Sequence, residues 1–241
     1  MCGVTMDAGA RFLAAFNEIE DHFRSALSVD DHTEFVSMAR DYADSRRLPK
    51  EYRDELSAFA SLRNAIVHGR YYGGRPIAEP VAEVVDQIEQ LRDRIVAPPA
   101  ALRVLGSMNV CTTGPDEPIS SALDHIRRFD YSQLPVYDGA VYAGILTTNA
   151  IARWLAAQLA ASGGLAEAES VRRVLTFAEP HEQALHVPKT LTAAEAIHHL
   201  SSDGRSAVAL IITHSGKITE RPLAVVVRHD LPALMAELTI S

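Results

Sequence analysis

Cysteine, tryptophan and long hydrophobic runs are scarce in this sequence of 241 residues. Its two cysteines, Cys2 and Cys111, provide neither a disulfide framework nor a metal-binding cluster, and so few thiols are typical of a reducing compartment. No stretch approaches the roughly 18 consecutive apolar residues of a transmembrane helix. The opening MCGVTMDAGARF has no basic region followed by an apolar run, so no secretory signal is expected. These absences predict a cytoplasmic protein without a membrane partner.

Positive charge is also scarce, because the net charge is −8. A broad basic surface is therefore not expected, and DNA is not expected as a partner. Residues 40–75 are a local exception with an excess of three positive charges. This excess indicates either a local surface for RNA or a solvated helix face with ion pairs at i,i+4 spacing. The basic residues of this window are Arg40, Arg46, Arg47, Lys50, Arg53, Arg63, Arg70 and Arg75.

The hydrophobic content of 47% and the length suffice for two domains, at roughly 100–200 residues per domain. In the first hundred residues, apolar side chains recur at helical spacing and predict helices over 8–27, 31–43, 50–68 and 81–96. Gly69 follows the third helix and is predicted to end it in the left-handed conformation. The prolines of APPA, residues 97–100, end the fourth helix and mark a domain boundary.

The remaining sequence alternates between helical and strand patterns. Residues 119–129 and 149–161 read as helices, and a strand, turn and strand lie between them around Asp138-Gly139. After a flexible joint at residues 162–164, the same pattern recurs from residue 190 onward. The fold class is therefore predicted as α+β: an all-α bundle over residues 1–98, then two β-α-β-β-α repeats over 99–165 and 166–241.

The segment QLPVYDGAVYAGILTTNAIARWL, starting at Gln133, carries a family resemblance. It resembles the core of a CBS domain, whose signature is Leu-Pro-Val-x-Asp, a turn, and Gly-hydrophobic-hydrophobic-Thr-x-x-Asp. The two repeats, over roughly residues 101–240, resemble a tandem CBS pair. This resemblance implies binding of an adenosyl nucleotide, such as AMP, ADP or ATP, in clefts between the repeats.

The first repeat offers three nucleotide-site residues where its last strand meets its last helix. A helix N-terminus presents free N–H groups to a phosphate, and the hydroxyls of Thr147 and Thr148 add hydrogen bonds there. Asn149 is taken to replace the family's ribose-binding carboxylate, so one acceptor remains without the charge. Both threonines are equally consistent with ordinary helix N-caps.

The second repeat offers Asp230 and Arg228. Asp230 keeps the ribose carboxylate, whereas Val227 replaces the threonine and Arg228 restores a phosphate contact. Asp230 is equally consistent with a carboxylate that only stabilises its helix N-terminus. One working nucleotide site is expected, with phosphates near Thr147. The alternative for the whole pair is a dimerisation scaffold without a ligand.

The stretch RNAIVHG at residues 63–69 carries a second resemblance. An Arg followed five positions later by His is expected about once by chance in a chain with 20 Arg and 10 His. The neighbouring Asn64, the Gly after His68 and the place at the end of a third helix are more specific. Together they resemble the Arg-(Asn/Asp/His)-x-x-x-His motif of HEPN domains, which are all-α modules found in many prokaryotic ribonucleases and toxins.

This second resemblance implies metal-independent cleavage of RNA by attack of the ribose 2′-hydroxyl. His68 would act as the acid or base and Arg63 would stabilise charge on the phosphoryl oxygens, while Asn64, one turn away, would orient the imidazole. Arg63 and His68 are about 140° apart around the helix, so they are predicted to share a site only across the two-fold axis of a homodimer. Tyr71 and Tyr72 would stack on bases or simply pack.

The sequence therefore predicts a homodimeric nucleotide sensor whose helical domain cleaves RNA, with no cofactor for catalysis and an adenine nucleotide as the regulatory ligand. The rival is a non-catalytic sensor whose helical bundle dimerises or docks a partner, with Arg63 and His68 in structural roles. A toxin paired with an acidic antitoxin is a third reading.

Overall fold

The computed structural model describes residues 7–46, 48–69, 76–106, 109–162, 168–201 and 207–239. It divides into two compact units, one of residues 1–99 with 235–241 and the other of residues 100–234. The division of the second unit at residue 165 stays a prediction. Several residues discussed above lie outside the described ranges: Cys2, Arg47, Arg70, Tyr71, Tyr72, Arg75 and the joint at 163–164.

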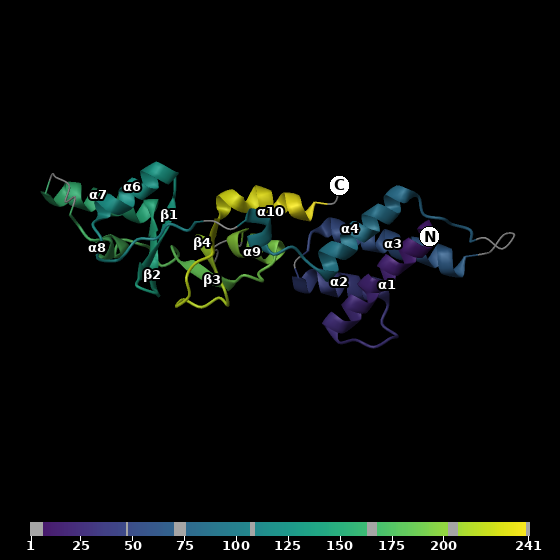
Figure 1. Cartoon of the computed structure of the whole chain (residues 1–241). Helices are drawn as coiled ribbons and strands as arrows, with labels where there is room; N and C mark the ends of the chain where they lie inside the picture. Colours follow the sequence, from purple (N-terminus) through teal and green to yellow (C-terminus); the bar gives the residue numbers. More distant parts are fainter. Residues whose placement is uncertain are drawn as a thin grey trace, which may run out of the picture. The chain divides into compact units, whose positions relative to one another are not determined.

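The helical unit contains α1 (Ala8–Leu27), α2 (Phe35–Arg46), α3 (Lys50–His68) and α4 (Ala82–Val96) (Figure 1). The predicted apolar stripe of α1 is its buried face, because Phe12, Phe16, Ile19 and Phe23 are all at most 2% exposed. These side chains form one core with Leu56 and other residues of α2, α3 and α4. The unit is held together by this core, as expected for an amphipathic helix bundle.

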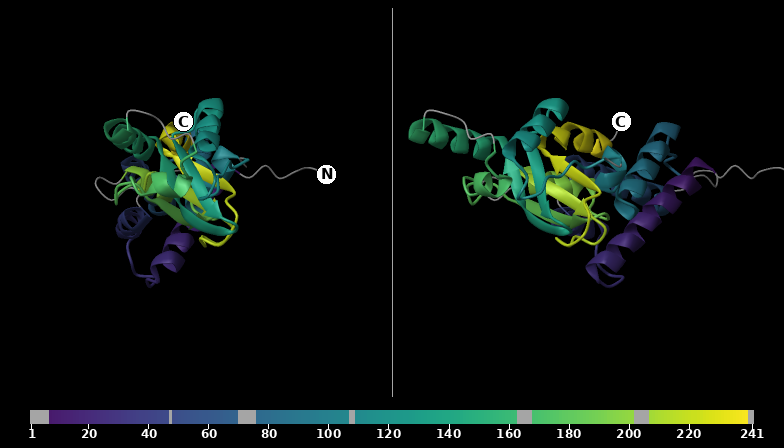
Figure 2. Two further views of the ribbon diagram at one scale, coloured as in Figure 1. Left: turned by 90° about the vertical axis from the view of Figure 1, so that its left-hand side faces the viewer. Right: turned by 60° about the vertical axis from the view of Figure 1, so that its left-hand side comes forward.

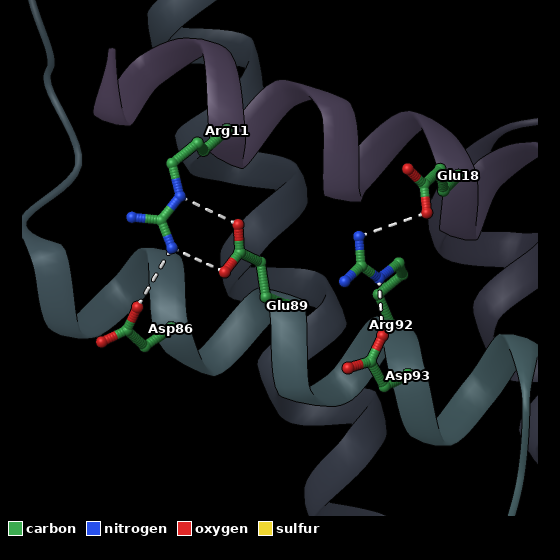
Figure 3. A network of polar contacts seen from close by, with 6 residues as sticks. All are labelled: Arg11, Glu18, Asp86, Glu89, Arg92 and Asp93. Carbon is green, nitrogen blue, oxygen red and sulfur yellow. Dashed lines mark hydrogen bonds and ion pairs between the residues drawn. The ribbon is translucent and has the colours of Figure 1, made fainter. Parts of the chain in front are cut away.

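Ion pairs line the solvent side of the contact between α1 and α4 (Figure 3). Arg11 Nε and Nη2 donate to the two carboxylate oxygens of Glu89 at 3.0 and 2.6 Å, and Nη2 also reaches Asp86. Arg92, about one turn beyond Glu89 on α4, pairs with Glu18, about two turns beyond Arg11 on α1. These partly exposed pairs fix the register of the two helices more than they stabilise them.

The end of α3 differs from its prediction. Gly69 has φ −66° and ψ 163°, an extended conformation, so the predicted left-handed C-cap is wrong. Its N–H still closes the helix by donating to Ala65 O. Glycine is needed there for space, since a Cβ would lie 2.1 Å from Ala65 O and 2.5 Å from Ile77 Cγ2.

We expect Gly69→Ala to destabilise the helical unit by about 1–3 kcal/mol, because the added methyl group forces backbone atoms apart. The free energy of unfolding from urea denaturation measures this. Gly9→Ala, in the first turn of α1 with no atom closer than 3.6 Å to the new Cβ, is the matched control. Equal stability of the two variants would contradict the steric explanation.

The second unit contains the two repeats as far as Leu234. In the first, α5 (Ala101–Leu105) and α6 (Ile119–Phe129) precede the antiparallel hairpin of β1 (Gln133–Asp138) and β2 (Val141–Thr147), then α7 (Thr148–Ser162). The predicted turn at Asp138-Gly139 is confirmed, with Gly139 at φ 60°. The short α8 (Val171–Leu175) follows.

The second repeat has the predicted β-α-β-β-α order. It comprises β3 (Ala184–Pro188), α9 (Ala193–Ser201), β4 (Ala209–Thr213), β5 (Ala224–Val227), the 3₁₀ turn η1 (Arg228–Asp230) and α10 (Leu231–Leu238). β4 pairs parallel with β3 and antiparallel with β5. All five residues of β4 are buried, as expected for a central strand. The α+β fold class is therefore confirmed.

The two repeats pack against each other through their strands. Figure 2 shows the teal strands of the first repeat beside the green and yellow strands of the second. Tyr142 donates its N–H to Ile218 O across this seam, and its ring meets His186 edge-on at 4.5 Å. Burial of His186 lowers its pKa, which favours the neutral imidazole inside the seam. This packing brings β1, β2 and β5 together around two cavities.

Candidate functional site

The first cavity, which we call the Asp230 cavity, measures about 580 Å³, within the range of small-ligand sites. The first repeat contributes residues 109–111 and 129–133 together with Pro135. The second repeat contributes Val225, Val227, His229 and Asp230. The cavity thus combines an apolar wall with two carboxylates, that of Asp130 from the first repeat and that of Asp230 at the start of a helical segment.

Asp230 is held in place by its own turn. Its Oδ2 accepts a hydrogen bond from the backbone N–H of Val227 at 2.8 Å, and the side chain is half-buried. Across the cavity, Tyr131 stacks on Phe129 with 5.5 Å between ring centroids. Cys111, on the same wall, contacts His125 Nδ1 through its sulfur at 3.3 Å, and burial raises the pKa of the thiol. The Asp230 carboxylate therefore shares the cavity with these side chains and with one further carboxylate, that of Asp130.

The second cavity, which we call the Thr147 cavity, measures about 600 Å³ and is lined by residues 147–149, His181, Glu182, Val208 and 227–229. It shares Ser132, Gln133, Val227 and His229 with the Asp230 cavity, so the two adjoin. Thr147, Thr148, Asn149 and Arg228 therefore line one cavity and Asp230 lines the other. The sequence predicts the first three at the strand-to-helix junction of the first repeat and the other two at that of the second, with one working site expected.

The equivalent of Asp230 in the first repeat is Ala150, not Asn149. Gly144 and Ala224 occupy equivalent strand positions, and counting six residues onward from each gives Ala150 and Asp230. Ala150 is fully buried, and its N–H donates to the capping hydroxyl of Thr147. The identification of Asn149 as a substitute for the ribose carboxylate was a misalignment by one residue. The first repeat has no carboxylate at this position.

The hydroxyl of Thr147 is already engaged within the protein. Thr147 is 4% exposed, and its Oγ1 donates to Glu182 Oε1 at 3.0 Å while accepting from Ala150 N. Glu182, from the segment between α8 and β3, is also bound by the Arg153 guanidinium and by the N–H of Glu179 at 2.8 Å. Sequence reasoning missed Glu182, because no local pattern marks a residue that acts across 35 positions of the chain.

The environment of Glu182 fixes its charge. Burial raises its pKa, but hydrogen bonds from Glu179 N–H, the Thr147 hydroxyl and Arg153 outweigh that effect and hold the pKa below its ordinary value of 4.5. The carboxylate is thus an anion with three hydrogen bonds inside the fold.

We expect Glu182→Gln to lower the free energy of unfolding at neutral pH and to lose this difference in acid. A depressed pKa contributes stability that is complete above pH about 4.5 and declines as the pH falls through the folded-state value. Denaturant titrations of both proteins at several pH values measure the gap. A gap that stays constant from neutral pH down to about pH 3 would contradict the assignment, since it would not depend on the carboxylate's ionisation.

The Arg–His motif lies at the exposed end of α3. Arg63 Nη1 lies 3.2 Å from His68 Nε2, so the prediction that one helix keeps the two side chains apart is wrong. The angular argument ignored the reach of the long arginine side chain. Asn64 Oδ1 accepts a hydrogen bond from Arg63 at 3.3 Å instead of contacting the imidazole, and the guanidinium lies 5.9 Å above the Phe16 ring.

The described residues contain neither a cluster of metal ligands nor a membrane-spanning helix. Among these residues, no group of three or more His, Cys, Asp or Glu side chains is placed to hold a metal ion. Within the same ranges, no helix is long and apolar enough to cross a membrane.

The second unit thus consists of α/β repeats with cavities at their strand-to-helix junctions. The family model described as "CBS domain" matches residues 105–157, so the first repeat is a CBS domain. No curated protein sequence matches the chain.

Solved structures of similar fold include the CBS-domain-containing protein ATU1752 from Agrobacterium tumefaciens, with 19% identity, coverage of 56% of this chain and 89% of that one, and a TM-score of 0.41. A signal-transduction protein with CBS domains from Burkholderia ambifaria MC40-6 has 17% identity, coverage of 59% and 98%, and a TM-score of 0.45. CBSX2 in complex with AMP has 15% identity, coverage of 54% and 90%, and a TM-score of 0.39.

Proposed function

We propose that this protein is an adenine-nucleotide sensor that binds its ligand in the Asp230 cavity. The observation that carries the proposal is the position of Asp230: an anchored carboxylate at one edge of a ligand-sized cavity in a CBS repeat pair. Because Val227 N–H occupies Oδ2, Oδ1 is directed to the ribose, whose two hydroxyls are donors that a carboxylate accepts well.

The opposite wall is suited to the base. Val110, Pro135 and Val225 supply apolar surface, and Tyr131 an aromatic ring, which together favour a flat heteroaromatic group. The backbone of residues 109–111 borders the same wall, where its N–H and C=O groups can read the edge of adenine. The phosphates then extend toward His229, which lines both cavities.

Thermal melting of the full chain tests this function. The melting temperature with AMP, ADP, ATP or GTP is compared with that in a matched buffer without nucleotide. Binding to the folded state raises the melting temperature, so adenine nucleotides are expected to stabilise the protein and GTP much less. No shift with any adenine nucleotide would contradict the sensor function.

For the helical unit we propose a second, separate activity, metal-independent cleavage of RNA by Arg63 and His68. The contact between Arg63 Nη1 and His68 Nε2 supports it, because a fixed cation and an imidazole then share one exposed site. In this proposal, binding of the nucleotide regulates the rate of RNA cleavage. The protein is also proposed to act as a homodimer. The alternative is a bundle that docks a partner without catalysis.

A further inference from the structure

We propose that Glu182 is a built-in anion that fills the phosphate position of the Thr147 cavity, so that the CBS pair takes up one nucleotide per chain rather than two. The stoichiometry of one nucleotide per chain rests on the function proposed for the Asp230 cavity. The claim that the Glu182 carboxylate fills the phosphate position of the Thr147 cavity does not depend on that function. The inference starts from the groups that surround the Glu182 carboxylate.

Those groups are the ones that proteins use to hold a phosphate. The Arg153 guanidinium approaches the carboxylate on Oε2 and donates its Nε–H to Phe177 O at 2.7 Å, which fixes its plane. The Thr147 hydroxyl donates to Oε1 and the backbone N–H of Glu179 to Oε2. A fixed guanidinium, a hydroxyl and a backbone N–H together make an anion site.

The burial of the Glu182 carboxylate indicates that its donors are not accessible to an external phosphate. The Glu182 side chain is 2% exposed, and the Thr147 residue 4%. A phosphate would have to displace a carboxylate that already satisfies each of these donors, and a second negative charge beside it would be repelled. The lowered pKa of Glu182 keeps that charge in place at neutral pH.

A second adenosine also lacks its ribose partner in this cavity. The position equivalent to Asp230 is the buried Ala150, whose side chain accepts no hydrogen bond. Both recognition elements, the ribose carboxylate and the open phosphate position, are therefore missing from the Thr147 cavity. What remains is a space of about 600 Å³ next to the occupied anion site.

Removing the internal anion opens the site. In Glu182→Ala the Thr147 hydroxyl, the Glu179 N–H and Arg153 Nη2 lose the carboxylate that they bind. Arg153 Nη1 keeps its ion pair with the Glu179 carboxylate. A small anion is expected to replace the lost group. We expect inorganic phosphate, compared with chloride at equal ionic strength, to raise the melting temperature of Glu182→Ala by a few degrees and to leave wild type unchanged. The double variant Glu182→Ala/Arg153→Ala is expected to lose the effect.

The outcomes separate this inference from the proposed function. A phosphate effect on wild type equal to that on Glu182→Ala, or on neither protein, overturns the inference. If Glu182→Ala melts without a cooperative transition, restoration of that transition by phosphate supports the inference, and failure to restore it overturns it. Two AMP molecules bound per wild-type chain would also overturn it. Absence of AMP binding overturns the nucleotide function alone, since the phosphate experiment does not depend on it.

Discussion

Asp230→Asn is expected to lower the affinity for AMP by roughly 10- to 100-fold, the range for weakened hydrogen bonds to a charged acceptor. The amide oxygen still accepts from Val227 N–H, so the η1 turn and the cavity wall are retained. The loss then reports on recognition of the ribose hydroxyls, which need the second acceptor and its charge. Isothermal titration calorimetry of both proteins gives the two dissociation constants.

Asp130→Asn is the matched control for this variant. Asp130 lines the same cavity, and at φ 55° it has a left-handed conformation that asparagine adopts readily. The change removes the same charge from the same cavity without touching the proposed ribose contact, so near wild-type affinity is expected. Equal losses in the two variants would mean that a general electrostatic effect, and not ribose binding, explains the result for Asp230.

His68→Ala is expected to reduce RNA cleavage by about 10²- to 10⁴-fold, the usual contribution of a general acid or base. The measurement is the rate of cleavage of a mixed RNA substrate in EDTA, which removes contaminating metal-dependent nucleases. Arg63→Ala is expected to cause a similar loss, because the guanidinium that stabilises the phosphoryl charge is removed.

His32→Ala is the control for His68→Ala, since His32 is an exposed histidine in the loop between α1 and α2 of the same unit. It should cleave as wild type does. Equal cleavage by wild type and His68→Ala would exclude the proposed chemistry. If neither wild type nor any variant cleaves the RNA, the alternative remains that the helical unit docks a partner without catalysis.

Local patterns were enough to predict much of this fold. The bounds of α1, α3 and α6 match their predictions, because apolar side chains repeat at helical spacing in each of them. The hairpin at Asp138-Gly139 followed from a two-residue turn between apolar strands. The short helices α5 and α8 were missed, since five residues are too few to show a period.

The candidate site depended on contacts that local patterns do not contain. Glu182 meets Thr147 and Arg153 only after the repeats pack together, so no spacing in the sequence indicates it. The distribution of Thr147 and Asp230 over two adjoining cavities likewise follows from tertiary packing. The contact between Arg63 and His68 depends on side-chain length, which a helical projection of Cα positions leaves out. The residue types in the motifs indicated candidate site residues, whereas the side chains that contact those residues in the folded protein could not be predicted from the sequence.

Titration of the full wild-type chain with AMP tests the central claim most directly, because it reports affinity and stoichiometry together. The account predicts one AMP per chain, bound in a way that Asp230→Asn weakens and Asp130→Asn does not. Two AMP molecules per chain, or binding that Asp230→Asn leaves unchanged, would contradict it.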